Sequence, residues 1–359
     1  MDTSRLPFLH LLALVLGTLL SISPARAAAR IVSPWPSADA VEVRVDDVTL
    51  RSSDPFAPND IGRARARQVR AQLYLPPHTA GDHSTPAVVF LHGSGGLSSE
   101  RGERYGRELA AMGVVSLVIE TYDSRADLGR SFLDRVLNIT ETMFVADAYA
   151  GLAALAARPE IDARHVVLTG FSYGGMAATY AIQAQLADAL APRLADGRRL
   201  HFAGHVAFYA PCIARFRDTR TTGAPLLMLY GQQDELIVPR RCDEVANDLR
   251  AGGSQVSIVS YPGAVHQWDG AMPRRLIGRH LGDCSLSVSR GGLITDDRTG
   301  LPMTGPFLRK LILGLCTTSD PYPIGRDEAV RARSNRDFGA FLDRVFAGGP
   351  SGYTSRLTR

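Results

Sequence analysis

From residue 87 onward, short continuous apolar runs alternate with segments that have helical periodicity. The apolar runs are residues 87–91, 114–119, 166–168, 206–209, 225–230 and 256–259, and the helical segments are residues 101–112, 137–157, 176–190 and 240–251. Strands buried on both faces read as continuous apolar runs, and their alternation with helices is typical of a parallel sheet. The pattern therefore predicts an α/β fold with a mostly parallel central sheet flanked by helices.

Two stretches before residue 87 have a different pattern. Residues 41–45 and 63–75 alternate apolar and polar side chains, which predicts strands with one solvated face. The second stretch begins with Arg63, Arg65 and Arg67. These arginines could bind anions, but charged side chains on an edge strand also keep a sheet from pairing with other chains. We favour the second interpretation.

The alternation stops near residue 271. Residues 271–324 contain dispersed Gly, Arg, Asp and Thr, and Cys284 and Cys316 bracket most of this stretch, which indicates an insertion. A final helix is expected at about residues 325–347, where apolar residues recur at helical spacing. Since there is no repeat, Gly/Ser linker or low-complexity tract, we expect residues 28–359 to form one domain with a core at about 70–270.

The first 27 residues have the pattern of a signal peptide. Arg5 precedes an apolar run at residues 9–20, and small residues follow, so that cleavage is expected after Ala27 or Ala29. The run is shorter than the roughly 20 apolar residues of a permanent membrane helix. We therefore expect an exported protein, in the bacterial periplasm or secreted, with no integral membrane span in the mature chain.

Composition narrows the class of protein further. Of 359 residues, 45% are hydrophobic and 21% are charged, which excludes a disordered chain. The net charge of +4 comes from 40 basic and 36 acidic residues, and this balance argues against nucleic acid as a partner.

Export changes how the four cysteines are interpreted. In an oxidising compartment an even number of cysteines favours disulfides over a metal site. Cys212 and Cys242 are expected near the carboxyl edge of neighbouring strand units, which makes a bridge between them reasonable, and Cys284 then pairs with Cys316 by elimination. Four buried free thiols remain the alternative. No metal site and no cofactor are expected.

The sequence G-F-S-Y-G at residues 170–174 is the most informative motif. A Gly-x-Ser-x-Gly pattern alone is weak evidence, but here an apolar strand runs into it and a small-residue helix runs out of it, as a nucleophile elbow requires. Ser172 is therefore the predicted nucleophile. The alternative is a tight turn in which this serine only caps the helix.

A serine nucleophile needs a histidine base and a carboxylate that orients the histidine. Asp234 follows the strand at 225–230, and His266 follows the strand at 256–259, so both belong at the carboxyl edge of the sheet after Ser172. Glu235 and Asp269 are the competing carboxylates and are less suitably placed.

The oxyanion of the reaction needs backbone N–H donors. The N–H of Tyr173, directly after the nucleophile, is one candidate, and the N–H of Ser94 in the glycine-rich loop at residues 92–96 is the second. A phosphate-binding loop is the rival interpretation of these glycines, but neither phosphate-loop fingerprint is present.

Four motifs together resemble the dienelactone hydrolase family of the α/β-hydrolase fold. They are residues 92–96 (HGSGG), 170–175 (GFSYGG), 230–234 (YGQQD) and 263–266 (GAVH). The resemblance covers about residues 70–270 and the last helix. It implies that the segment with Tyr122 and Arg125 borders the active site, where both could contact substrate. A salt-bridged loop is the alternative, which we favour.

These residues predict an exported serine hydrolase that cleaves a small-molecule carboxylic ester through an acyl-enzyme. A thioesterase or peptidase could use the same triad, and a catalytically silent fold could serve as a binding module. A complete triad argues against the silent module, which has no need of all three residues.

Overall fold

The structure is a computed structural model that describes residues 29–79, 82–194, 196–278, 281 and 283–348. The predicted signal peptide, residues 1–27, lies outside the described residues.

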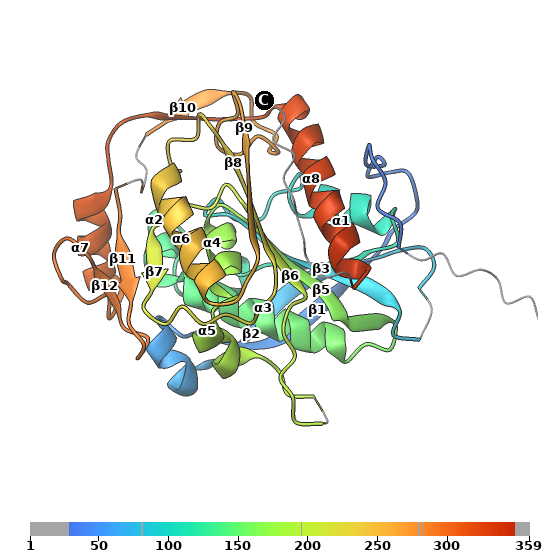
Figure 1. Ribbon diagram of the computed structural model, residues 1–359, viewed down its shortest axis with the longest axis horizontal. Coiled ribbons are helices and arrows are strands. Elements are labelled where there is room, and N and C mark those ends of the chain that lie inside the picture. The colour runs from blue at the N-terminus through green and yellow to red at the C-terminus, as the bar shows by residue number, and fades with distance from the viewer. Residues whose placement is uncertain (1–28, 80–81, 195, 279–280, 282, 349–359) are drawn as a thin grey trace, which may run out of the picture.

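The main sheet, formed within the described residues, has eight strands in the order β1-β2-β4-β3-β5-β6-β8-β9 (Figure 1). The β2–β4 and β1–β2 pairs are antiparallel, and the other pairs are parallel. The strands are β1 (Arg44–Ser53), β2 (Ala66–Leu75), β3 (Thr85–Leu91), β4 (Val115–Ile119), β5 (Ile161–Phe171), β6 (Gly204–Phe208), β8 (Leu226–Gly231) and β9 (Val256–Tyr261). The predicted α/β-hydrolase fold, with its mostly parallel sheet, is confirmed.

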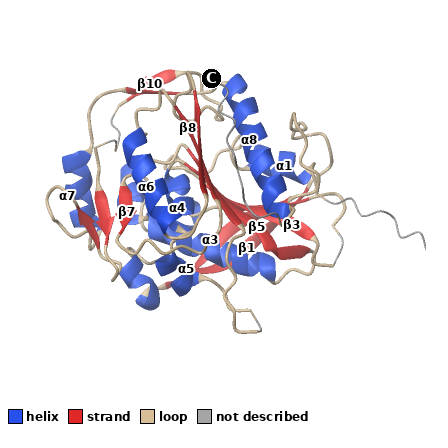
Figure 2. Ribbon diagram, viewed as in Figure 1, coloured by secondary structure: helices blue, strands red, loops and turns tan. Residues whose placement is uncertain are grey.

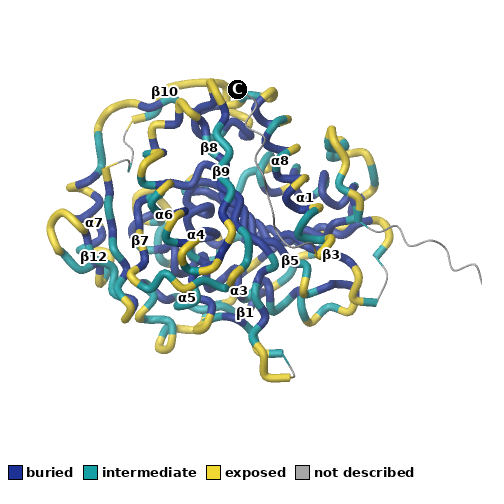
Figure 3. Tube along the Cα trace, viewed as in Figure 1, coloured by how far each residue is buried: buried dark blue, intermediate teal, exposed yellow. Residues whose placement is uncertain are grey.

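Helices cover both faces of this sheet (Figure 2). One face packs against α3 (Glu141–Ala156), α4 (Tyr173–Tyr180), α5 (Ala184–Leu190) and α6 (Pro239–Ala251), and the other against α1 (Glu103–Ala110) and α8 (Glu328–Phe346). Two apolar clusters fill these layers, and the central strands are buried from both sides (Figure 3). Burial on both faces explains why these strands read as continuous apolar runs.

Two predicted helices are each divided in the structure. The segment predicted at 137–157 forms α2 (Phe132–Asn138) and α3, because Ile139 and Thr140 have extended backbones between them. The segment predicted at 176–190 forms α4 and α5, and Gln183 is extended at the start of α5. Apolar residues recur on both sides of each break, so periodicity alone does not reveal the breaks.

The strand predicted at residues 63–75 begins only at Ala66, and it is the second strand of the sheet and not its edge, because β1 pairs with it from Ala66 to Leu75. Two of the three predicted arginines have acidic partners within the chain. Arg67 donates to both Asp54 and Asp127, and Arg63 donates to Asp60 at the end of the short 3₁₀ helix Pro58–Arg63.

The segment at 271–324 contains regular structure that its composition did not predict. Its elements are β10 (Arg275–Ile277), β11 (Leu286–Val288), β12 (Ile294–Asp296), α7 (Pro306–Cys316) and β13 (Tyr322–Ile324). β11 pairs with β7 (Ala214–Phe216), which follows β6, so the segment is joined to the hydrolase core by a small second sheet.

The structure contains both predicted disulfides, Cys212–Cys242 and Cys284–Cys316. The first joins the loop after β6 to α6, and the second joins the stretch between β10 and β11 to the end of α7. The alternative of four free thiols is therefore not what the structure shows.

Within the described ranges, no single helix has both the length and the apolar character of a membrane span. The pair α2 and α3 meets those criteria only together, and the two helices are bent by 76°. Most of α3 is buried in the hydrolase core, as is usual for the core helix of a folded domain.

Candidate active site

Ser172, Asp234 and His266 meet at the carboxyl edge of the sheet. They follow β5, β8 and β9 respectively, and all three side chains are buried. The Oγ atom of Ser172 lies 2.9 Å from Nε2 of His266, and Nδ1 of His266 lies 2.7 Å from Oδ2 of Asp234. The arrangement has the hydrogen-bond reach that general-base activation of a hydroxyl requires.

Ser172 lies on a sharp turn between β5 and α4. Its φ of 52° is in the left-handed region, which is uncommon for a residue other than glycine. A Cβ at Gly170 would lie 2.0 Å from the carbonyl oxygen of Gly174, and one at Gly174 would lie 2.4 Å from that of Leu91. The turn therefore needs glycine at both positions, and strain at such a site is typical of function.

The hydroxyl of Ser172 does not cap the helix that follows it. Its side-chain partner is His266, so the capping alternative is not the arrangement in the structure. Instead, Ser172 presents its Oγ atom to the imidazole from the start of α4.

Asp234 orients the imidazole of His266. Its Oδ1 atom accepts from the N–H of Leu236 at 3.1 Å, which leaves Oδ2 directed at Nδ1 of His266. Since the carboxylate accepts the Nδ1 proton, Nε2 is the ring nitrogen free to accept a proton from Ser172.

The two competing carboxylates are placed elsewhere. Glu235 is exposed, and Asp269 accepts from the hydroxyls of Tyr209 at 2.6 Å and Tyr105 at 3.4 Å. Tyr209 links Asp269 to the site indirectly, because its ring meets the imidazole of His266 edge to face at 4.8 Å between centroids. Sequence analysis did not identify Tyr209, although it follows β6 directly at the same sheet edge.

The glycine-rich loop lies against the nucleophile. A Cβ at Gly93 would be 3.4 Å from Cβ of Ser172, and Gly96 N–H donates to Gly93 C=O at 3.0 Å to close a tight turn. Ser94 is the second residue of that turn, so its N–H takes no part in the turn hydrogen bond. The N–H of Tyr173 lies in the first turn of α4, where helical N–H groups lack an intrahelical acceptor.

His92 supports this loop, a role that sequence analysis missed. Its Nδ1 atom lies 2.8 Å from the carbonyl oxygen of Gly93, and its Nε2 atom accepts from the N–H of Tyr122 at 3.3 Å. Burial lowers the pKa of His92 to about 4, so the ring is neutral at pH 7. Its position directly after β3, at the head of the glycine-rich motif, was the available signal.

Arg125 is held by carboxylates of the chain itself, which does not fit the substrate contact considered for it. Its side chain is fully buried and binds both oxygens of Asp147 at 2.7 and 2.8 Å, as well as Asp54 at 2.8 Å. The salt-bridged loop that we favoured is the observed arrangement. A guanidinium that already binds two carboxylates has no free pair of donors for a substrate carboxylate.

Tyr122 is also enclosed. Its ring contacts His92 at 4.8 Å and Phe144 at 5.4 Å between centroids, and the guanidinium of Arg135 lies over it at 5.3 Å. Tyr122 therefore lies beneath the glycine-rich loop, and a substrate contact through this residue remains a prediction.

The 271–324 segment reaches the histidine loop. Ile324 of β13 forms an isolated parallel bridge with His266, and the N–H of Gly325 donates to the carbonyl oxygen of His266 at 2.9 Å. The ring of Tyr322 lies 6.3 Å from that of His266. The composition of residues 271–324 gave no indication that this segment contacts the backbone of His266.

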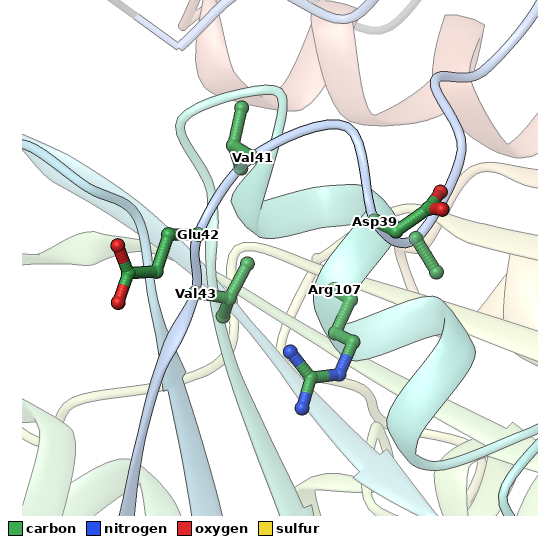
Figure 4. A pocket seen from close by; sticks show the side chains of 6 residues that line it. Asp39, Val41, Glu42, Val43 and Arg107 are labelled. Carbon is green, nitrogen blue, oxygen red and sulfur yellow. The ribbon is translucent and has the colours of Figure 1, made fainter.

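A separate hollow in the described part of the chain lacks this arrangement. An open hollow of about 520 Å³ is lined by Asp39, Glu42, Arg107 and three apolar residues (Figure 4). It contains no nucleophile paired with a base. Among the described residues, no three His, Cys, Asp or Glu side chains are grouped so that they could hold a metal ion.

The fold and the elbow define this chain as an α/β hydrolase. The sequence model of the dienelactone hydrolase family matches residues 69–274, which is more than half of the chain. The chain belongs to the dienelactone hydrolase family, and the predicted resemblance is confirmed.

Individual relatives are more distant. A protein of Salmonella typhimurium, provisionally named carboxymethylenebutenolidase, is 26% identical over 206 residues, covering 55% of this chain and 72% of its own. A provisionally assigned dienelactone hydrolase from Klebsiella pneumoniae has a TM-score of 0.46 at 20% identity and covers 62% of this chain and 88% of its own. Esterase 2 from Thermogutta terrifontis, in a propionate-bound structure, has a TM-score of 0.45 at 17% identity, over 56% of this chain and 80% of its own.

Proposed function

We propose that this hydrolase cleaves carboxylic esters of small molecules through a serine acyl-enzyme. The observation that carries the proposal is the continuous hydrogen-bonded chain from Ser172 through His266 to Asp234. His266 takes the hydroxyl proton as Ser172 attacks the acyl carbon, and then returns that proton to the leaving alcohol. Water releases the acyl group by the same steps in a second half-reaction.

The N–H groups of Tyr173 and Ser94 hold the negative oxygen of the tetrahedral intermediate. Support comes from their position, since one follows the nucleophile directly and the other lies in the turn that packs on Ser172. Preorganised donors of this kind stabilise charge that develops only in the transition state. No cofactor is needed for this chemistry.

We also infer that the protein is exported. The support is the signal-like pattern of residues 1–27 and the pair of disulfides, which form and persist in oxidising compartments. Mass spectrometry of the periplasmic or secreted protein should find a mature chain that begins at Ala28 or Arg30. A full-length chain retained in the cytoplasm would contradict this.

A substrate panel tests the reaction class. It contains nitrophenyl esters of graded acyl length, a butenolide, a matched thioester and a matched nitroanilide. Turnover of the esters, with the thioester and anilide much slower, is the expected result. Faster turnover of the thioester or the anilide would support the alternative hydrolases, and a folded protein that turns over none of them would support a binding module.

A further inference from the structure

A buried arginine connects the 271–324 segment to the nucleophile elbow. Arg309 lies on the inner side of α7, and its side chain is almost completely buried, whereas its neighbour Lys310 is exposed. Arginine is rarely buried in this way unless its charge and its donors are satisfied by partners. The groups that bind Arg309 therefore indicate its structural role.

The guanidinium of Arg309 binds three other helices at once. Its Nε atom donates to the carbonyl oxygen of Val136 in α2 at 2.9 Å. Its Nη2 atom donates to Oε1 of Glu141 in α3 at 3.1 Å, and to the hydroxyl of Tyr173 in α4 at 3.0 Å. Glu141 lies opposite the guanidinium and balances its charge inside the core.

Tyr173 is held at the far end of its side chain by this contact. Its hydroxyl accepts from Arg309 and donates to the carbonyl oxygen of Ile139 at 2.9 Å. Its ring packs edge to face on Phe144 at 5.2 Å between centroids. Because Tyr173 is the first residue of α4, fixing its ring also limits rotation of the backbone that carries its N–H.

We propose that Arg309 is a positioning residue for the oxyanion hole, through which α7 of the disulfide-closed segment holds the N–H of Tyr173 in its reactive orientation. The inference rests on the proposed function, in which that N–H binds the oxyanion. It assigns the segment a role in the reaction itself: α7 sits at the edge of the molecule (Figure 1) but reaches the elbow through one side chain. Small displacements of a catalytic donor are costly, since about 1 Å can reduce the rate by about 10²-fold.

Three variants separate this role from general packing. Arg309→Met removes the guanidinium, and Arg309→Met with Glu141→Met also removes the carboxylate that would otherwise be buried without a partner. Tyr173→Phe leaves the Arg309–Glu141 pair intact and removes only the hydroxyl. Ile312→Ala is the matched control, because Ile312 is a fully buried apolar residue of the same helix that makes none of these polar contacts.

The readouts are kcat, KM and the inhibition constant of a trifluoromethyl ketone, whose adduct with Ser172 carries an oxyanion. All three variants should lower kcat about 10- to 100-fold, change KM less than about threefold and weaken the ketone in parallel with kcat/KM. Ile312→Ala should lose thermal stability but keep kcat and ketone affinity within about twofold. Wild-type kcat and ketone affinity in Arg309→Met/Glu141→Met and Tyr173→Phe would overturn the proposal, as would an equal loss in Ile312→Ala.

A second measurement keeps the two proposals distinguishable. In ¹⁵N-tyrosine protein, the amide resonance of Tyr173 should shift in both Arg309 variants and stay in place in Ile312→Ala. If the wild type hydrolyses no ester but this resonance still shifts, the proposed function fails while the positioning contact stands. If the wild type is active and the resonance does not move, the positioning role of Arg309 is wrong.

Discussion

The Nε2 atom of His266 lies 2.9 Å from the Oγ atom of Ser172, although 94 residues separate them in the chain. The two residues meet because each follows a parallel strand, Ser172 directly and His266 after a short loop, at the same edge of one sheet. Asp234 follows β8, which lies between β5 and β9 in the chain, and its carboxylate bonds to the imidazole of His266.

Asp234 and Asp269 are both buried carboxylates near His266, but only Asp234 bonds to its ring. Asp234→Asn should lower kcat/KM by about 10⁴-fold, because the amide no longer selects the tautomer with a free Nε2. Asp269→Asn should cost far less, since Asp269 acts on the site only through Tyr209. Steady-state kinetics with one nitrophenyl ester compares the two variants. Equal losses would show that the orienting carboxylate is misassigned.

Gly174 has no room for a side chain, because a Cβ would meet the carbonyl oxygens of Leu91 and His92 at 2.4 and 2.5 Å. Gly174→Ala should therefore lower the free energy of unfolding by about 3 kcal/mol or more. Gly314→Ala is the matched control, since a Cβ there meets nothing within 4 Å and alanine favours the helix by up to about 1 kcal/mol. Urea unfolding measures both. A Gly174→Ala protein as stable as the wild type would contradict the packing described for the elbow.

The two disulfides close loops of similar length, with sequence separations of 30 and 32 residues. Replacing either pair by serines should lower the free energy of unfolding by about 3–4 kcal/mol, according to the chain-entropy model. Only the Cys284→Ser/Cys316→Ser protein should become sensitive to limited proteolysis within the 271–324 segment. Resistance of that segment in the variant would show that packing, without the disulfide, is enough to hold α7.

Two buried histidines make stability depend on pH. Burial lowers the pKa of both His92 and His205 to about 4, below the value of about 6.5 expected in the unfolded chain. The unfolded state therefore binds more protons between these values, so this stability is present above about pH 6.5 and is lost as the pH falls towards 4. Each histidine should contribute a slope of about 1.4 kcal/mol per pH unit in that window.

His205→Asn isolates one of these contributions. Asparagine can keep a donor near the Ala178 carbonyl oxygen, which lies 2.9 Å from Nδ1 of His205, but it does not titrate. Urea unfolding at several pH values between 4.5 and 7 gives the free energy of unfolding as a function of pH. The slope for the variant should be smaller than that of the wild type by about 1.4 kcal/mol per pH unit, which corresponds to one proton. An unchanged slope would mean that burial does not lower the pKa of His205 in the folded protein.

Much of the triad could be predicted because each member follows a strand that is recognisable in the sequence. Continuous apolar runs mark the ends of β5, β8 and β9, and parallel topology then brings Ser172, Asp234 and His266 to one edge. The same reasoning placed Cys212 near Cys242, and the Cys284–Cys316 pair then followed by elimination. These inferences need only strand order and direction, which depend on local pattern and on general rules of chain connection.

Contacts between side chains that are distant in sequence were beyond that reasoning. Arg309 and Tyr173 are 136 positions apart, and nothing in the pattern of α7 shows that one arginine points inward. The salt bridge favoured for Arg125 is present, but its partner Asp147 was not identified, because Asp147 lies in the middle of an apolar helix. The pairing of charged groups inside a core depends on three-dimensional packing. The periodicity of a single sequence carries no information about that pairing.

Fluorophosphonate labelling tests the central claim most directly, because the reagent reacts with a serine activated by its own triad. Labelling of the wild-type protein, followed by peptide mass spectrometry, should place one phosphonyl group on Ser172. His266→Ala should slow the labelling by several orders of magnitude, and Ser172→Ala should abolish it, while Ser257→Ala, at the opposite edge of the sheet, should react like the wild type. A folded wild-type protein that remains unlabelled, or a label on any serine other than Ser172, would contradict the account.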